Sequence, residues 1–165
     1  MELYLVQHGE SKSEMEAPSR PLTDRAKEEV EKVACCVAEL GIEVVRILHS
    51  GKLRAKQTAE LFAQQLTPLA GIAEQDGLGP LDDPHRVKEL ILQAEESLMI
   101  VGHLPHLKRL ASLLILGEPE KDIVNFRMGG VVCLAKSGES WAVDWALAPL
   151  LARQTGQATG SRKRD

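Results

Sequence analysis

Hydrophobic and polar residues follow two periods along this chain, one typical of strands and the other of helices. Short apolar or β-branched runs predict strands, and apolar residues at a spacing of three or four predict helices. The predicted strands are residues 2–6, 44–48, 97–101, 131–135 and 141–146. The predicted helices are residues 24–40, 53–66, 87–94 and 105–116. Residues 67–84 are expected to be irregular, with a short strand near Ile72.

Local signals place the ends of these elements. Thr23 is the expected N-cap of the first helix, and Gly41 is its natural stop. The apolar face of this helix is predicted to contain Val30, Val33, Ala34, Val37 and Leu40. Ser137–Gly138 predicts the turn of a hairpin between the last two strands. Trp141 and Trp145 are expected on one face of the final strand, as packing residues.

The order of the elements predicts the fold class. Strands alternate with helices through the first two-thirds of the chain, and a hairpin follows. This order favours a three-layer α/β/α domain with a mostly parallel, mixed sheet. We expect residues 1–151 to form one domain. Residues 152–165 are polar and rich in glycine, so we expect a flexible C-terminal tail.

Composition excludes several classes of protein. Hydrophobic residues make up 44% and charged residues 27% of the chain, as in ordinary soluble domains. The net charge of −4 argues against a nucleic-acid-binding protein, and no apolar run is long enough to span a membrane. The first residues show no signal-peptide pattern. The three cysteines, Cys35, Cys36 and Cys133, have no zinc-site spacing, so we expect reduced thiols in a cytoplasmic protein.

Residues that could bind a ligand or take part in catalysis follow three of the predicted strands. The segments are Gln7-His8-Gly9-Glu10, His49–Arg54 and Gly102–Pro105. In open α/β sheets, ligands bind beyond the carboxyl ends of the strands. One crevice is therefore expected to contain His8, His103 and Arg54.

This set of residues suits phosphoryl transfer. A neutral imidazole can attack phosphorus and form a covalent intermediate. A guanidinium binds phosphate oxygens in a fork and keeps its charge. A glycine such as Gly9 lets backbone and phosphate approach closely. A second imidazole can donate a hydrogen bond as charge moves in the transition state.

Three ordered motifs resemble one family. The stretch LVQHGE resembles the RHG signature of the histidine phosphatase superfamily, which is also called phosphoglycerate mutase-like. The stretches HSGKLRAKQTAE and IVGHLPHL resemble the superfamily's segments with the phosphate-binding arginine and the second histidine. The segment SRPLT, the short length and the GHLP form resemble the branch of SixA-type phosphohistidine phosphatases.

The resemblance implies a phosphoglycerate mutase-like fold and a role for each matching residue. His8 would accept the phosphoryl group, and Arg54 and His103 would hold its oxygens. Gln7, Gly9 and Arg20 are the further expected substrate-binding residues. No cofactor and no metal are expected, because the histidines have no Asp or Glu ligand cluster at useful spacing.

The chain departs from the superfamily at two positions. Gln7 stands where the superfamily has arginine, so one charged phosphate donor is missing; Lys12 or Arg20 are candidates to supply it. Gly51 replaces the usual proline after the serine, and we expect a looser turn there. Asp82 and Asp83 are the local candidates for a general acid, with a helix cap before Pro84 as the alternative.

Three functions remain open from the sequence. The first is a phosphatase that acts on phosphohistidine in proteins. The second is a phosphatase for a small phosphoester or anhydride, which would need the aspartates as acid. The third is a phosphate-binding regulatory module with weak catalysis, suggested by Gln7. Among the other histidines, His49 and His106 are expected to have supporting or structural roles, and His85 is expected on the surface.

Overall fold

The computed structural model describes residues 1–152, and its centre is a six-stranded sheet in the order β3-β2-β4-β1-β5-β6. Its strands are β1 (Glu2–Gln7), β2 (Arg46–His49), β3 (Ile72–Glu74), β4 (Leu98–Gly102), β5 (Val131–Ser137) and β6 (Ser140–Leu147). Strands β1 to β4 pair in parallel, whereas β5 pairs antiparallel with both β1 and β6. The predicted mixed, mostly parallel sheet and the terminal hairpin are thus confirmed.

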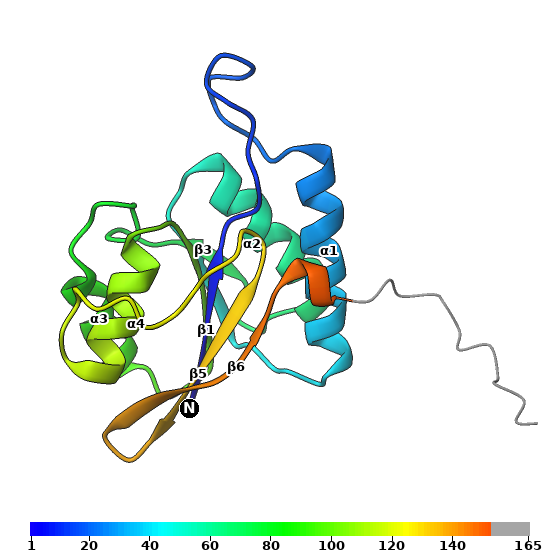
Figure 1. Cartoon of the computed structure of the whole chain (residues 1–165). Coiled ribbons are helices and arrows are strands. Elements are labelled where there is room, and N and C mark those ends of the chain that lie inside the picture. The colour runs from blue at the N-terminus through cyan, green and yellow to red at the C-terminus, as the bar shows by residue number, and fades with distance from the viewer. Residues whose placement is uncertain (153–165) are drawn as a thin grey trace, which may run out of the picture.

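Helices cover both faces of the sheet (Figure 1). The helices are α1 (Asp24–Glu39), α2 (Leu53–Leu66), α3 (Pro84–Gln93) and α4 (His106–Leu116), followed by a short 3₁₀ turn, η1 (Pro149–Leu151). Helices α1 and α2 pack on one face through residues such as Val33 and Phe62. Helices α3 and α4 pack on the other face through residues such as Ile91 and Leu110. The predicted three-layer α/β/α fold is confirmed.

Strand alternation explains the two cores. Along β1, Leu3 and Leu5 face the α3–α4 core, whereas Tyr4 and Val6 face the α1–α2 core. A strand buried on both faces reads as a continuous apolar run, as β1 does.

The register of the central strands builds one edge of the sheet. Gln7 at the end of β1 pairs with Gly102 at the end of β4, and His49 at the end of β2 pairs with Val101. Strand β4 lies between the other two, so three chain segments leave the sheet side by side. The long loop after β1 rises above this edge, at the top of Figure 1. This edge is where the functional residues were predicted.

Helix boundaries agree with the capping signals in most places. Thr23 caps α1 by accepting a hydrogen bond from the Ala26 amide at 3.1 Å. Helix α3 begins at Pro84, three residues before its predicted start, because Asp83 caps it and a proline suits the first turn. Leu40 was predicted on the apolar face of α1 and is instead 68% exposed, since the helix ends at Glu39.

The two tryptophans of β6 lie on opposite faces, contrary to the prediction. Val143 pairs with Leu134 and Trp145 pairs with Cys133, which leaves Asp144 as the extra residue of a β-bulge. The bulge shifts the alternation by one residue. Trp141 therefore joins the α3–α4 core, and Trp145 packs on the α1–α2 core beside Tyr4.

Several expectations concern the surface and the tail. None of the helices within residues 1–152 has both the length and the apolar character that crossing a membrane requires. The three cysteines form no disulfide, and Cys133 is the fully buried one. The tail predicted for residues 152–165 lies, after Ala152, outside the described residues.

Candidate active site

The structure brings His8, Arg54 and His103 together at the carboxyl edge of the sheet. His8 follows β1, His103 follows β4, and Arg54 stands in the first turn of α2. The ring centroids of His8 and His103 are 4.9 Å apart, and the Arg54 Nε lies 3.3 Å from His8 Nε2. The sequence predicted this juxtaposition from the three strand ends alone.

The hydrogen bonds of His8 define its tautomer. Its Nδ1 lies 2.6 Å from the Gly9 carbonyl oxygen, which can only accept, so Nδ1 carries the hydrogen. Nε2 is then the unprotonated nitrogen, and it accepts a hydrogen bond from Arg54. The pKa of His8 is lowered to about 4, mainly by burial; the Gly9 carbonyl opposes this effect, and Arg54 and Arg20 add to it. At neutral pH the ring is uncharged, and its lone pair accepts the Arg54 hydrogen bond.

Gly9 and Thr58 fix the position of this histidine. The Gly9 amide donates to Thr58 Oγ1 at 3.1 Å, and the same hydroxyl donates to the Arg54 carbonyl oxygen at 2.7 Å. A Cβ on Gly9 would lie only 3.1 Å from the side chain of Val30, so the strand end can approach α1 because residue 9 is glycine. Thr58 thus links the segment that follows β1 to helix α2. The sequence analysis did not identify Thr58; only its position one helical turn after Arg54 could have indicated that it lies near the site.

Arg20 lies at the base of the loop above the site. Its φ of +50° is in the left-handed region, and its guanidinium donates to Ser11 Oγ and to the Lys12 carbonyl oxygen, both at 3.3 Å. Its charge lowers the pKa of His8 and of Arg54, in both cases after the larger effect of burial. Its charge thus acts on both His8 and Arg54. Lys12, the other candidate cation, is exposed.

Ser50 contacts the second histidine, a feature that the sequence analysis missed. Its Oγ lies 2.6 Å from His103 Nε2, whereas His103 Nδ1 is buried without a hydrogen-bond partner in residues 1–152. The pKa of His103 is lowered to about 3, mainly by burial, with smaller contributions from His8 and Arg54. Both imidazoles of the site are thus neutral at physiological pH.

The turn between β2 and α2 differs from the loose turn that was predicted. Gly51 has a φ of +78°, and its amide donates to His49 Nδ1 at 3.1 Å. A proline could take neither that φ nor that hydrogen bond. His49 is 4% exposed, so this buried ring closes the turn and has the supporting role expected of it.

Gln7 is buried at the end of β1. The alternation of the strand puts its side chain on the face of Leu3 and Leu5, and it is 7% exposed. Its backbone carbonyl oxygen accepts a hydrogen bond from the Gly129 amide at 2.8 Å. The chain therefore has a neutral amide at the position where the RHG signature carries a charge.

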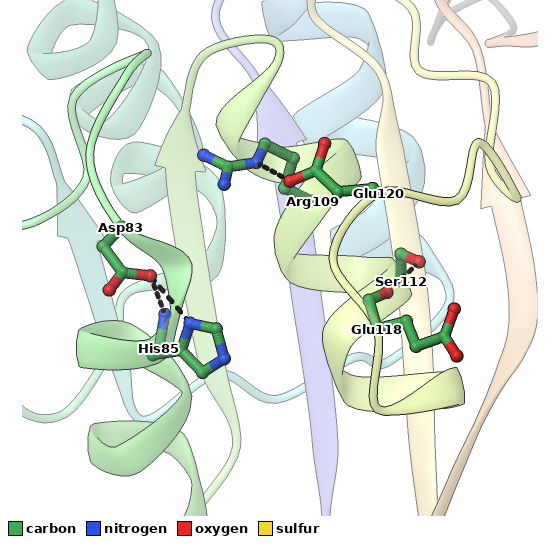
Figure 2. A network of polar contacts seen from close by, with 6 residues as sticks. All are labelled: Asp83, His85, Arg109, Ser112, Glu118 and Glu120. Carbon is green, nitrogen blue, oxygen red and sulfur yellow. Dashed lines mark hydrogen bonds and ion pairs between the residues drawn. The ribbon is translucent and has the colours of Figure 1, made fainter.

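Asp82 and Asp83 hold local structure. Asp82 Oδ2 accepts from the Gly79 amide at 2.7 Å, and Asp83 Oδ1 accepts from the His85 amide at 3.1 Å and contacts His85 Nδ1 at 2.8 Å (Figure 2). The predicted cap before Pro84 is confirmed, with Asp83 as the capping residue. The hydrogen bonds of both carboxylates within the described residues stay in this loop and in α3, away from His8. A general-acid role for either remains a prediction.

The remaining histidines differ in exposure. His85 is exposed, as expected. His106 is fully buried; burial lowers its pKa, and the Asp82 carboxylate and a contact with the Gly77 backbone oppose that effect. Within the same residues, no group of three His, Cys, Asp or Glu side chains is placed to hold a metal ion.

Comparison with known proteins gives a consistent family. Residues 3–80 match the model of the histidine phosphatase superfamily (branch 1). An uncharacterized protein of Picosynechococcus sp. is 30% identical over 142 residues, covering 81% of this chain and 84% of its own length. The phosphohistidine phosphatase SixA of Escherichia coli is 26% identical over 154 residues, covering 90% of this chain and 94% of its own.

Solved structures share the fold. The protein histidine phosphatase SixA complexed with tungstate matches with a TM-score of 0.80 and 24% identity, over 91% of this chain and 98% of that one. The α-ribazole phosphatase of Shigella flexneri matches with a TM-score of 0.72 and 16% identity, over 90% and 97%. The predicted phosphoglycerate mutase-like fold is thereby confirmed.

The buried neutral histidines predict a specific pH dependence of folding. His8, His103, His49 and His106 all have pKa values lowered by burial, so the native state binds fewer protons than the unfolded chain below about pH 6.5. The free energy of unfolding should therefore fall by a few kcal/mol as the pH drops from about 6.5 to about 4, because each tenfold difference in proton affinity corresponds to about 1.4 kcal/mol. Urea denaturation at several pH values measures this.

His106 provides the matched test. His106→Leu should flatten the slope of the free energy of unfolding below pH 6.5, because it removes a buried imidazole whose pKa is lowered by burial. The exposed His85, changed to Gln, serves as the control and should leave the slope unchanged. An identical slope in His106→Leu and the parent would contradict this account.

Proposed function

The chain belongs to the histidine phosphatase superfamily, and we propose that it is a phosphohistidine phosphatase whose His8 carries the phosphoryl group as a covalent intermediate. The similarity to SixA of Escherichia coli supports the phosphatase class. The proposed substrate is a phosphorylated histidine on a protein.

One observation carries the nucleophile assignment. His8 Nδ1 donates to the Gly9 carbonyl oxygen, so Nε2 carries no hydrogen, and its lone pair accepts a hydrogen bond from Arg54 that a phosphoryl oxygen could take over. A phosphoryl group bound by Arg54 would meet that lone pair directly. Because its pKa is about 4, the ring needs no separate base to deprotonate it at neutral pH.

The reaction proceeds in two displacements. His8 Nε2 attacks phosphorus, the bond from phosphorus to the leaving atom breaks, and the leaving group takes up a proton. Water then attacks the phosphorus, the bond to Nε2 breaks, and inorganic phosphate leaves. The guanidiniums of Arg54 and Arg20 stabilise charge on the equatorial oxygens in both steps, and the neutral His103 ring lies beside His8, with ring centroids 4.9 Å apart.

The local hydrogen bonds of Asp82 and Asp83 favour phosphohistidine over an ester as substrate. The leaving nitrogen of a phosphoramidate takes up a proton easily, whereas an alkoxide leaving group needs an acid. Asp82 and Asp83 are exposed, and each already accepts a backbone hydrogen bond within its loop. The alternative, a phosphatase for a small ester or anhydride, is supported by the shared fold of the α-ribazole phosphatase. Gln7 favours a third possibility, a phosphate-binding module that turns over slowly.

The covalent intermediate gives the first test of catalysis. Incubation with a ³²P-labelled phosphohistidine peptide should trap an acid-labile, base-stable phosphoenzyme in the parent and none in His8→Ala. His85→Ala is the control, since that histidine is exposed and lies in the first turn of α3. A labelled intermediate that survives in His8→Ala would rule out the nucleophile assignment.

Substrate preference is tested by a panel without added metal. Turnover of a phosphohistidine peptide, a phosphomonoester and a phosphoanhydride should rank in that order. Asp82→Asn and Asp83→Asn should leave phosphohistidine turnover within about twofold, because the leaving nitrogen needs no carboxylic acid. A large loss on the phosphohistidine peptide, with folding intact, would favour the ester phosphatase and an acid role for the carboxylate. No turnover of any of the three by the parent would favour the binding module.

The missing charge at Gln7 predicts a gain of activity. A charge-assisted hydrogen bond contributes roughly 1.5–3 kcal/mol, against about 0.5–1.5 kcal/mol for a neutral one. Gln7→Arg should therefore raise kcat/KM, by about tenfold. Gln7→Met, which keeps the length but has no donor, should lower it. Unchanged or lower turnover of Gln7→Arg, with an unaltered circular dichroism spectrum, would count against this account of Gln7.

A further inference from the structure

Ser50 is a polar side chain at the site with no role in the mechanism above. It follows β2 directly, and its Oγ lies 2.6 Å from His103 Nε2. The other ring nitrogen, Nδ1, is buried and has no partner in the described part of the chain. The Ser50 hydroxyl is therefore the one side-chain hydrogen bond in residues 1–152 that fixes the rotation of the His103 ring.

The turn that presents Ser50 is held by the residues on either side of it. The Gly51 amide donates to His49 Nδ1, and the φ of +78° at Gly51 suits glycine alone among common residues. A Cβ at position 51 would also lie 2.3 Å from a carboxylate oxygen of Glu74. His49 and Gly51 together direct the intervening serine toward His103.

The positions of the hydrogens decide what this contact can do. A neutral imidazole has one hydrogen, and His103 can donate from Nε2 only if the hydrogen is on that atom. The Ser50 oxygen then accepts from Nε2, and its own hydrogen is free to point elsewhere. With the hydrogen on Nδ1 instead, the serine would donate to Nε2, and a donor would be buried without an acceptor. The first arrangement gives a chain of two donors, from His103 through Ser50, that ends in a free hydroxyl hydrogen.

We propose that Ser50 positions His103 and that its hydroxyl hydrogen donates to an oxygen of the transferred phosphoryl group. This inference rests on the proposed phosphatase function and adds a residue to the same site. The hydroxyl is a neutral donor that contacts His103, whose ring lies 4.9 Å from that of His8 between centroids, in a site that has Gln7 in place of a charged donor. Hydrogen bonds in such a chain polarise one another, which strengthens the terminal donor.

The test compares Ser50→Ala with the parent in three measurements. Inorganic phosphate, the reaction product, should bind about 2- to 12-fold more weakly, the range of one neutral hydrogen bond. Turnover of the phosphohistidine peptide should fall by ~10²-fold, with a smaller change in KM, as for other lost transition-state donors. The side-chain ¹⁵N shifts of His103 should show a hydrogen on Nε2 in the parent and a mixture of tautomers in Ser50→Ala.

The control is a serine with a comparable bond outside the site. Ser97 Oγ donates to the Glu43 carbonyl oxygen at 2.8 Å, at the opposite end of the sheet. Ser97→Ala should leave phosphate affinity, kcat and the His103 shifts unchanged. Unaltered shifts and phosphate affinity in Ser50→Ala would overturn the proposal.

The two proposals fail separately. If the parent hydrolyses none of the phosphorylated substrates, the proposed function is wrong, while the phosphate affinity and the ¹⁵N shifts still decide the role of Ser50. If the parent is active and Ser50→Ala matches it in all three measurements, the role of Ser50 is wrong and the phosphatase function stands.

Discussion

The uncharged state of the His8 ring is the constraint on which the rest of the site depends. A buried imidazole loses its proton because the interior solvates a cation poorly, and this burial has the largest effect on the His8 pKa. The remaining hydrogen is on Nδ1 because the Gly9 carbonyl oxygen accepts it. Burial and one backbone contact together leave a lone pair on Nε2. The same burial requires β1 to end against α1, which Gly9 permits.

Neutral rings also let the two halves of the site approach. His8 and His103 lie with centroids 4.9 Å apart, a separation at which two imidazolium cations would repel strongly. The fixed positive charge is on guanidiniums instead, and Arg54 faces the lone pair of His8. The proposed nucleophile is therefore an uncharged histidine, whereas the positive charge that would bind the anion is on arginine. Thr58 maintains their spacing, since its hydroxyl bonds the backbones of Gly9 and Arg54.

The sequence predicted the features that local patterns determine. The layers and the three strand ends follow from apolar periodicity, and the juxtaposition of His8, Arg54 and His103 follows from the strand ends. Thr58 and Ser50 escaped prediction, because hydroxyl residues occur everywhere and only the tertiary structure gives them partners. The bulge that separates the faces of the tryptophans of β6 was missed because one inserted residue leaves no compositional trace.

Replacing a charged hydrogen-bond donor by neutral donors changes more than the affinity of the site for a phosphoryl group. A permanent cation attracts the phosphoryl group in the substrate, the transition state and the product alike, so its loss weakens all three. A hydroxyl held by a neutral imidazole is a shorter-range donor, and its contribution depends on the geometry of the phosphoryl oxygens. In this chain Gln7 lacks the first kind of donor, whereas the turn of His49, Ser50 and Gly51 supplies the second. A site of this kind binds its product less tightly for a given stabilisation of the transition state, because more of its binding energy depends on the geometry of the reacting group.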